Sequence, residues 1–141
     1  MPALTNYLET KILNYLFRGI SYTPPGTLYI GLTQSFDSGS LKSGIVDEPS
    51  TGGYARQSYS ATSGNWIAPY YSGIIAAVTH NTTQIQFPVA TSDIGDVSGI
   101  FIADDPASGN VLFFGQLSSP RYIRNGDQFV FSSGSLKASA S

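Results

Sequence analysis

The hydrophobic period of this 141-residue chain changes at Pro24-Pro25, and this change constrains the fold more than any other feature. Before it, residues 4–18 carry apolar side chains at the spacing of one helix face. The stripe consists of Leu4, Leu8, Ile12, Tyr15 and Leu16. Thr5 or Asn6 can cap the first turn, and Gly19 can adopt the left-handed stop. We therefore predict one helix over residues 4–18.

After the two prolines, apolar residues alternate with period two, which is typical of half-buried strands. Strand-like stretches occur at residues 27–33, 54–61, 65–79, 85–87, 99–103, 111–115, 122–124 and 128–131. Pro69 favours an edge, a bulge or a break within its stretch. One helix followed by about seven to eight short strands predicts a mainly β fold. We expect a single domain over residues 1–141, built as an antiparallel β-sandwich or barrel.

Two connections have the composition of hairpin turns. Residues 104–110 are rich in aspartate, proline, serine and glycine, which favour tight turns. Asn125-Gly126 separates residues 122–124 from residues 128–131, and this dipeptide is the strongest short signal for a type I′ hairpin. We predict a hairpin at each of these connections.

Two further segments lack a clear period. Residues 34–53 are long and polar, and a loop of this length in a compact domain is usually functional or disordered. We expect this segment to be an arm or contact loop. Residues 132–141 are small and polar, and we expect a strand end that frays into a tail.

The charge content of the chain excludes several functions. Only 11% of the residues are charged and the net charge is -2, so no basic field attracts nucleic acid. The chain has no cysteine, which removes disulfides, thiolate metal sites and cysteine nucleophiles. No apolar run is long enough to span a membrane. A weakly charged surface resists association poorly, and we therefore expect a homo-oligomer or another permanent protein partner.

Candidate catalytic groups are few. His80 is the only histidine, and no serine lies in a Gly-x-Ser-x-Gly elbow, so we favour a turn histidine over a catalytic one. The acidic cluster consists of Asp93, Asp96, Asp104 and Asp105. Turn hydrogen bonding explains these side chains better than calcium binding, because the Asp-x-Asp-x-Asp-Gly order is absent. We expect no enzyme activity, no catalytic residue, no cofactor and no metal.

Aromatic residues make up 13% of the chain and are more informative. Tyrosines on outward strand faces suit subunit contacts, although half-exposed strand positions and glycan stacking are alternatives. Arginines in a weakly charged chain suit pairing with a partner carboxylate. The candidate interface residues are Tyr29, Tyr54, Arg56, Tyr59, Tyr70, Tyr71, Arg121 and Arg124.

An ordered series of short blocks resembles a family of small tailed-bacteriophage virion proteins. The blocks are Leu4-Thr5-Asn6-Tyr7-Leu8-Glu9, Thr23-Pro24-Pro25, Leu28-Tyr29-Ile30-Gly31-Leu32, Gly53-Tyr54-Ala55-Arg56-Gln57, Ile85-Gln86-Phe87-Pro88, Gly99-Ile100-Phe101-Ile102-Ala103-Asp104, Leu112-Phe113-Phe114-Gly115-Gln116-Leu117 and Asn125-Gly126-Asp127. Members of this family are commonly described as tail-fibre or virion structural proteins. The resemblance implies a place in the virion, assembled in the cytoplasm of the bacterial host.

From these observations we expect a capsid cement or decoration protein, which stabilises the assembled shell by binding it. One domain without a repetitive shaft, a long loop and two polar termini favour this function. The alternative is a tail-fibre or tail-associated subunit. The expected partners are the major capsid protein or tail proteins, and contact with a host glycan is a further alternative.

Overall fold

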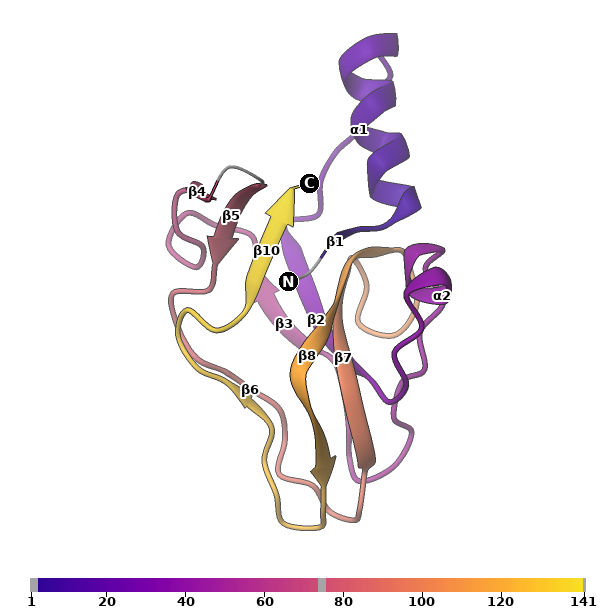
Figure 1. The fold of residues 1–141 in the computed structure, drawn as a ribbon, viewed down its shortest axis with the longest axis vertical. Coiled ribbons are helices and arrows are strands. Elements are labelled where there is room, and N and C mark those ends of the chain that lie inside the picture. The colour runs from indigo at the N-terminus through magenta and orange to yellow at the C-terminus, as the bar shows by residue number, and fades with distance from the viewer. Residues whose placement is uncertain (1–2, 74–75, 141) are drawn as a thin grey trace.

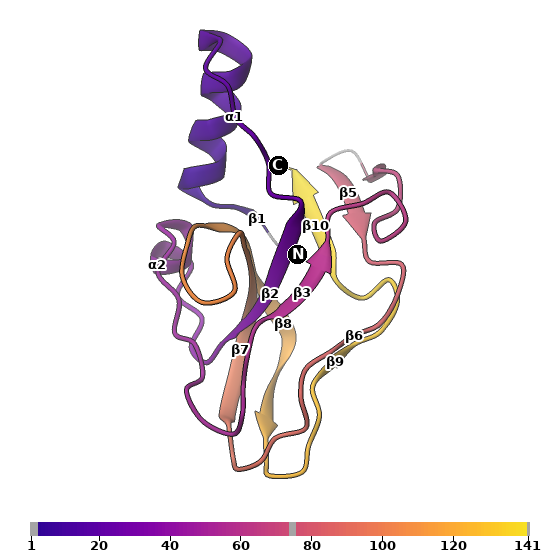
Figure 2. The same ribbon diagram turned by 180° about the vertical axis from the view of Figure 1, so that it is seen from behind.

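The computed structural model describes residues 3–73 and 76–140, which contain two helices and ten strands (Figures 1 and 2). In chain order these are β1 (Ala3–Leu4), α1 (Asn6–Arg18), β2 (Thr27–Thr33), α2 (Ser38–Lys42), β3 (Gln57–Ser60), β4 (Tyr70–Ser72), β5 (Ala76–His80), β6 (Ile85–Gln86), β7 (Gly95–Ala103), β8 (Val111–Ile123), β9 (Val130–Phe131) and β10 (Lys137–Ala140).

The strands form three antiparallel sheets within the described residues. The largest has the order β1-β8-β7-β2-β3, and the others are β10-β5-β4 and β6-β9. The mainly β prediction with an N-terminal helix is confirmed. The sheets do not close into a barrel, so the barrel alternative is wrong. More strands form than we expected, because several are pairings only two residues long.

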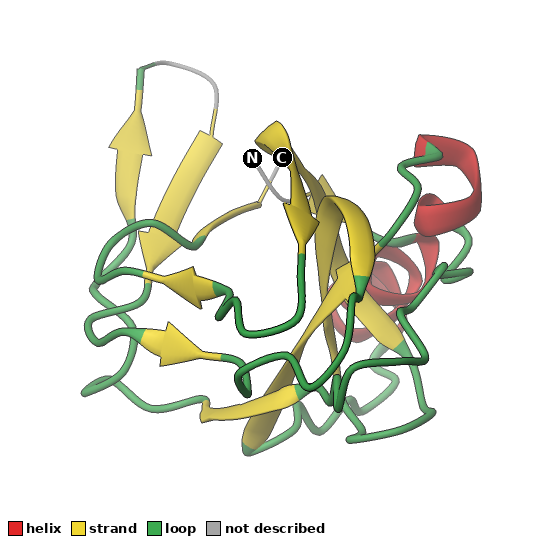
Figure 3. Cartoon of the chain, turned by 90° about the horizontal axis from the view of Figure 1, so that it is seen from below, coloured by secondary structure: helices red, strands yellow, loops and turns green. Residues whose placement is uncertain are grey.

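Both faces of the five-stranded sheet are covered. Ile100 and Ile102 belong to a core with Ile85 and Phe131 of the β6-β9 sheet, whereas Phe101 and Ala103 pack with Leu41 of α2. Figure 3 shows the small sheets on one side of the large sheet and the helices on the other. A strand buried on both faces needs apolar residues at consecutive positions, which explains the uninterrupted apolar run in β7.

The predicted helix is confirmed, but it begins at Asn6 rather than at residue 4. Leu4 instead pairs with Phe113 as part of β1. Thr5 is the cap: its hydroxyl accepts the Leu8 amide at 3.4 Å and donates to the Val111 carbonyl at 2.6 Å. Gly19 ends the helix with a φ of 64°. This cap therefore ties the start of α1 to β8.

One predicted hairpin is confirmed and the other is wrong. Residues 104–110 connect β7 to β8, and Ala103 pairs with Val111 across the turn. At Asn125-Gly126 the Asp127 amide donates to the Arg124 carbonyl at 2.9 Å, but only Gly126 has a positive φ. A type I′ turn needs a positive φ at both central residues. The following strand, β9, pairs with β6 rather than with β8.

Residues 34–53 are an integral part of the fold rather than a free arm. They contain α2, capped by Asp37, and they bury Leu41 against the five-stranded sheet. The Gln34 amide donates to the Asp47 carbonyl at 2.7 Å, which closes the segment on itself. Its packing within its own chain shows that it is no extended arm, and its contact with another protein stays a prediction.

The expected polar tail is corrected in part, because its residues 137–140 form β10. Lys137 pairs with His80, and the register continues to Ala140 opposite Ala77. Leu136 and Ala138 are buried. The buried Asn81 side chain accepts the Leu136 amide at 3.0 Å and donates to the Ser132 carbonyl at 3.1 Å. Small residues therefore serve here to let a strand pack closely.

Candidate interaction surfaces

Arg56, a candidate interface anchor, is used inside its own chain. Its side chain is only 5% exposed and forms an ion pair with Glu48. Arg56 Nη2 and Nε donate to the two Glu48 carboxylate oxygens at 2.7 and 3.1 Å. Arg56 Nη1 donates to the carbonyls of Asp105 and Ser108 at 2.7 and 2.8 Å. The guanidinium therefore ties the segment before β3 to the β7–β8 turn.

Tyr54 belongs to the same internal network. Its hydroxyl donates to Glu48 Oε2 at 2.8 Å and accepts the Leu32 amide at 2.9 Å. Burial raises the pKa of the Tyr54 hydroxyl well above its usual range, and the neighbouring Glu48 carboxylate adds to the shift. The hydrogen bonds that Arg56 donates to Glu48, together with the charge of this carboxylate, raise the pKa of the Arg56 guanidinium. Both groups keep their protons and hold the fold.

Tyr59 is a core residue, contrary to the expectation of an outward face. It is 9% exposed, and its ring packs edge-on against Trp66 with centroids 5.5 Å apart. Its hydroxyl donates to the Asn65 carbonyl at 3.0 Å and accepts the Thr83 amide at 3.2 Å. The strand alternation of β3 is regular, but this face of the strand points toward the small sheets.

The remaining candidates lie at the surface in different places. Tyr70 and Tyr71 are exposed on β4, the edge strand of its sheet, and Tyr29 is half-buried on β2. Arg121 is exposed on β8, and Arg124 stacks over the ring of Tyr122 at 5.1 Å. These side chains belong to separate elements, and the structure does not gather them into one surface with Arg56 and Tyr59.

Half of the exposed large apolar residues of the described chain lie on α1 or just after it, and none of them was among our candidate interface residues. The helix buries only Leu8 among its own residues. The exposed large apolar residues of the helix and the residue after its cap are Ile12, Leu13, Tyr15, Leu16, Phe17 and Ile20. The stripe predicted from the sequence signalled this face, but periodicity alone does not reveal whether a stripe is covered.

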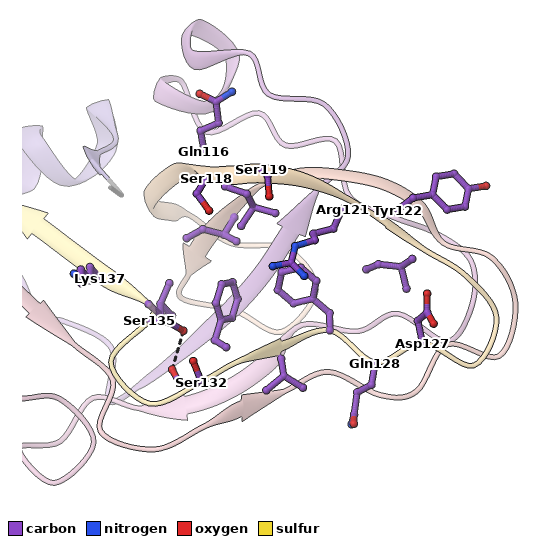
Figure 4. A pocket seen from close by; sticks show the side chains of 17 residues that line it. Gln116, Ser118, Ser119, Arg121, Tyr122, Asp127, Gln128, Ser132, Ser135 and Lys137 are labelled. Atoms are coloured by element: carbon purple, nitrogen blue, oxygen red, sulfur yellow. Dashed lines mark hydrogen bonds between the residues drawn. The ribbon is translucent and has the colours of Figure 1, made fainter.

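A half-open cleft of about 840 Å³ lies between β8 and residues 127–137. Its apolar lining includes Leu117, Phe129 and Leu136. Figure 4 shows Arg121 pointing into the cleft from β8, whereas Tyr122 points away from it. On the opposite wall, Ser135 donates to the Ser132 carbonyl at 2.7 Å. The cleft therefore has a mixed polar and apolar lining into which Arg121 points, and Asp127 and Lys137 also border it.

Three of the four clustered aspartates form hydrogen bonds with turn backbones. Asp104 accepts the Asn110 amide at 2.7 Å, and Asp93 accepts the Asn125 amide at 2.8 Å. Asp105 accepts the amides of Ala107 and Ser108 at 2.9 and 2.8 Å, and these bonds lower the pKa of its carboxyl. Turn chemistry therefore accounts for these carboxylates.

His80 ends β5, with its ring edge-on to Tyr70 at 6.2 Å between centroids. Within residues 3–73 and 76–140, no group of three or more histidine, aspartate or glutamate side chains is arranged to hold a metal ion. In the same residues, neither helix has the length and apolar character needed to cross a membrane.

Comparison with known proteins identifies the family of the chain. A family model described as podophage GP4 fiber I protein gp80 matches residues 3–139. No curated protein sequence shows significant similarity to the chain. The match extends from β1 to β10 and agrees with the virion-protein resemblance of the sequence blocks. The chain therefore belongs to the podophage GP4 fiber I protein gp80 family, whose name indicates a phage fibre and hence a virion component.

Proposed function

We propose that this chain is a non-enzymatic structural subunit of a phage tail fibre and acts through protein–protein contacts. The observation that carries this proposal is the family match over residues 3–139, because the family is described as a fibre protein. This description supports the tail-fibre alternative over the capsid cement function that we favoured from the sequence. We expect tail proteins as partners in a particle assembled in the host cytoplasm, and no cofactor.

The use of charged and polar groups inside the chain supports a structural role. Arg56 and Glu48 connect two loops, and three of the clustered aspartates hold turns. Groups committed to the fold in this way are not free to act as general acids or bases. The apolar face of α1 is a surface suited to protein contacts.

Locating the protein in intact particles tests the proposal. Antibody labelling or cryo-electron microscopy of the phage is expected to show this chain on the tail. Particles made without the gene are expected to retain full heads and to lack the corresponding tail density. Density confined to the capsid shell would establish capsid decoration instead and would contradict the tail-fibre proposal.

The non-enzymatic part of the proposal has its own test. Particles that carry His80→Ala, or alanine at the four clustered aspartates, are expected to infect normally whenever the altered chain is incorporated at the wild-type level. An incorporated His80→Ala chain with strongly reduced infectivity would contradict this part. The level of incorporation, measured on purified particles, separates a folding defect from a lost chemical role.

The cleft favours a second candidate function, the binding of an acidic host glycan. Its volume is in the range of small-ligand sites, and Arg121 points into it without an ion-pair partner among the described residues (Figure 4). Calorimetric titration with acidic surface oligosaccharides of the host is expected to show binding that Arg121→Ala weakens and Arg124→Ala does not. Absence of binding by the wild-type chain would remove this candidate.

A further inference from the structure

The helix α1 presents a broad apolar face that its own chain does not cover. It projects beyond the sheets, with its C-terminal end farthest from them (Figures 1 and 2). The side chains of Ile12, Leu13, Tyr15, Leu16, Phe17 and Ile20 are between 36% and 79% exposed. A 13-residue helix is marginal by itself in water, and most helices in proteins are stabilised by packing of their apolar face. This helix therefore needs a partner.

The apolar face is too wide for a single neighbouring helix. At about 100° per residue, the arc from Tyr15 through Ile12 and Leu16 to Phe17 covers roughly 200° of the helix. The stripe that a helix turns toward one neighbour is about 100° wide or narrower. Full coverage of the arc therefore requires one helix on each side of α1.

The exposed area favours the same arrangement. With roughly 200 Å² for a large side chain, the exposed fractions amount to on the order of 600 Å² per copy. A pair of helices would cover about half of each arc, or on the order of 600 Å² in total, which is the size of a lattice contact. In a closed ring of three copies the whole arc is covered, so each copy buries on the order of 600 Å², which is close to the ~800 Å² per partner of a standard interface.

The charges of α1 allow identical helices to pack together. Glu9 lies at the same azimuth as the arc, but at the body end of the helix, where it forms an ion pair with Lys42 of α2. The free cations Lys11 and Arg18 lie on the opposite side of the helix, where Arg18 bonds to Asn14 at 3.1 Å. No unpaired charge on the apolar arc repels a second copy.

We propose that the α1 helices of at least three copies of this chain pack side by side, in parallel, as a closed bundle. A heterologous contact repeated around a closed ring gives cyclic symmetry, in which all helices point the same way. The bodies, which lie at the base of the helices, then surround the lower end of the bundle. This inference depends on the helix alone and holds whether the assembly sits on the tail or on the head.

Sedimentation equilibrium of the purified full-length chain tests the proposal. The wild-type protein is expected to have at least three times the 15.0 kDa mass of one chain at tens of micromolar. The Leu16→Asp variant is expected to sediment as one chain with an unchanged β-sheet circular dichroism spectrum. Val89→Asp, which places the same carboxylate at another exposed apolar residue, is the matched control and is expected to keep the wild-type mass.

Cross-linking tests the direction of the helices and does not depend on Leu16→Asp remaining folded. The chain has no cysteine, so Phe17→Cys places a single thiol near the free end of α1. In a parallel bundle these thiols lie together and form disulfides rapidly under mild oxidation. In an antiparallel pair that overlaps over the whole of α1 they lie about 15 Å apart along the helix axis. Val89→Cys is the control for collisional cross-linking.

Three results would overturn the proposal. The first is a wild-type mass of one or two chains. The second is a Leu16→Asp variant that folds and keeps the wild-type mass, because the interface would then lie elsewhere. The third is a Phe17→Cys variant that cross-links no faster than Val89→Cys, or that cross-links in particles only to a different virion protein.

Discussion

The substitution Arg56→Met tests whether the Arg56–Glu48 pair holds the fold, as its geometry indicates. Arg56 makes four hydrogen bonds, two to the Glu48 carboxylate and two to backbone carbonyls of the β7–β8 turn. Its guanidinium also lies over the Phe101 ring, 4.9 Å from the centroid. Methionine keeps much of the apolar contact with Phe101 and removes all four hydrogen bonds.

The expected loss of stability follows from the burial of the pair. Breaking a buried, hydrogen-bonded ion pair costs ~3–5 kcal/mol, whereas a surface pair contributes less than ~1 kcal/mol. The Glu48 side chain is still 24% exposed, and Tyr54 continues to donate to it, so water and a neighbour partly compensate. We therefore expect a loss of about 3 kcal/mol in the free energy of unfolding. For a domain of this size that loss corresponds to a decrease in Tm of roughly 10 °C.

Urea unfolding followed by circular dichroism measures this loss, at one protein concentration because assembly shifts apparent stability. Arg124→Met is the matched control, since the Arg124 side chain is exposed and stacks on the Tyr122 ring, and its cost is expected to be below ~0.5 kcal/mol. In a double-mutant cycle with Glu48→Gln, we expect a coupling energy above about 1 kcal/mol. The reasoning would be refuted if Arg56→Met and Arg124→Met lowered the free energy of unfolding equally. It would also be refuted if the effects of Arg56→Met and Glu48→Gln were additive.

Three further predictions concern the core and pH dependence. Gly31→Ala is expected to cost ~1–3 kcal/mol, because a Cβ would overlap the Phe101 ring, whereas Gly26→Ala, with open space around it, is expected to be near neutral in the same urea assay. Asn81→Ala removes three hydrogen bonds to backbone groups and is expected to lower the free energy of unfolding by ~3 kcal/mol. It is also expected to accelerate amide hydrogen exchange in β10, and an exchange rate equal to that of the wild type would contradict this. The folded chain keeps the Tyr54 proton above pH ~10, whereas the unfolded chain loses it. The contribution of Tyr54 to the free energy of unfolding is therefore complete below pH ~10 and is lost as the pH rises further. Tyr54→Phe is therefore expected to flatten the alkaline decline in stability, and an unchanged slope would show that Tyr54 is not its source.

Local patterns predicted the elements whose cause is local. The strand at Thr27–Thr33 follows from alternation within the strand itself, and the helix from its own stripe and its cap at Thr5. The 104–110 turn follows from aspartates that bond to their own loop. In each case the residues that form the element also carry the signal for it.

The sequence did not reveal features whose cause lies elsewhere in the chain. Residues 111–115 and 122–124 were predicted as separate strands, yet β8 runs through both. The register with β7 shifts between the Val97–Arg121 and Gly99–Gln116 pairs, and residues 117–120 lie in this irregularity. The partner of Arg56 is eight residues away in sequence, and their pairing requires the fold of the 34–53 segment. Asn125-Gly126 indicated a turn correctly, but the strand that follows the turn, β9, pairs with β6 rather than with β8.

The apolar stripe on α1 shows a second limit of prediction from the sequence, which concerns what covers a helix face. Periodicity indicates that one face of a helix avoids water, and in most domains the same chain supplies the cover. Here both faces of the five-stranded sheet are already occupied, one by α2 and its flanking segment and the other by β6, β9 and the segments next to them. No sheet face remains for α1 to pack on, so its exposure is a consequence of the completed packing of the body. The low charge content also favours contact of α1 with other chains. The exposed face of this helix carries leucine, isoleucine and aromatic residues rather than charged ones.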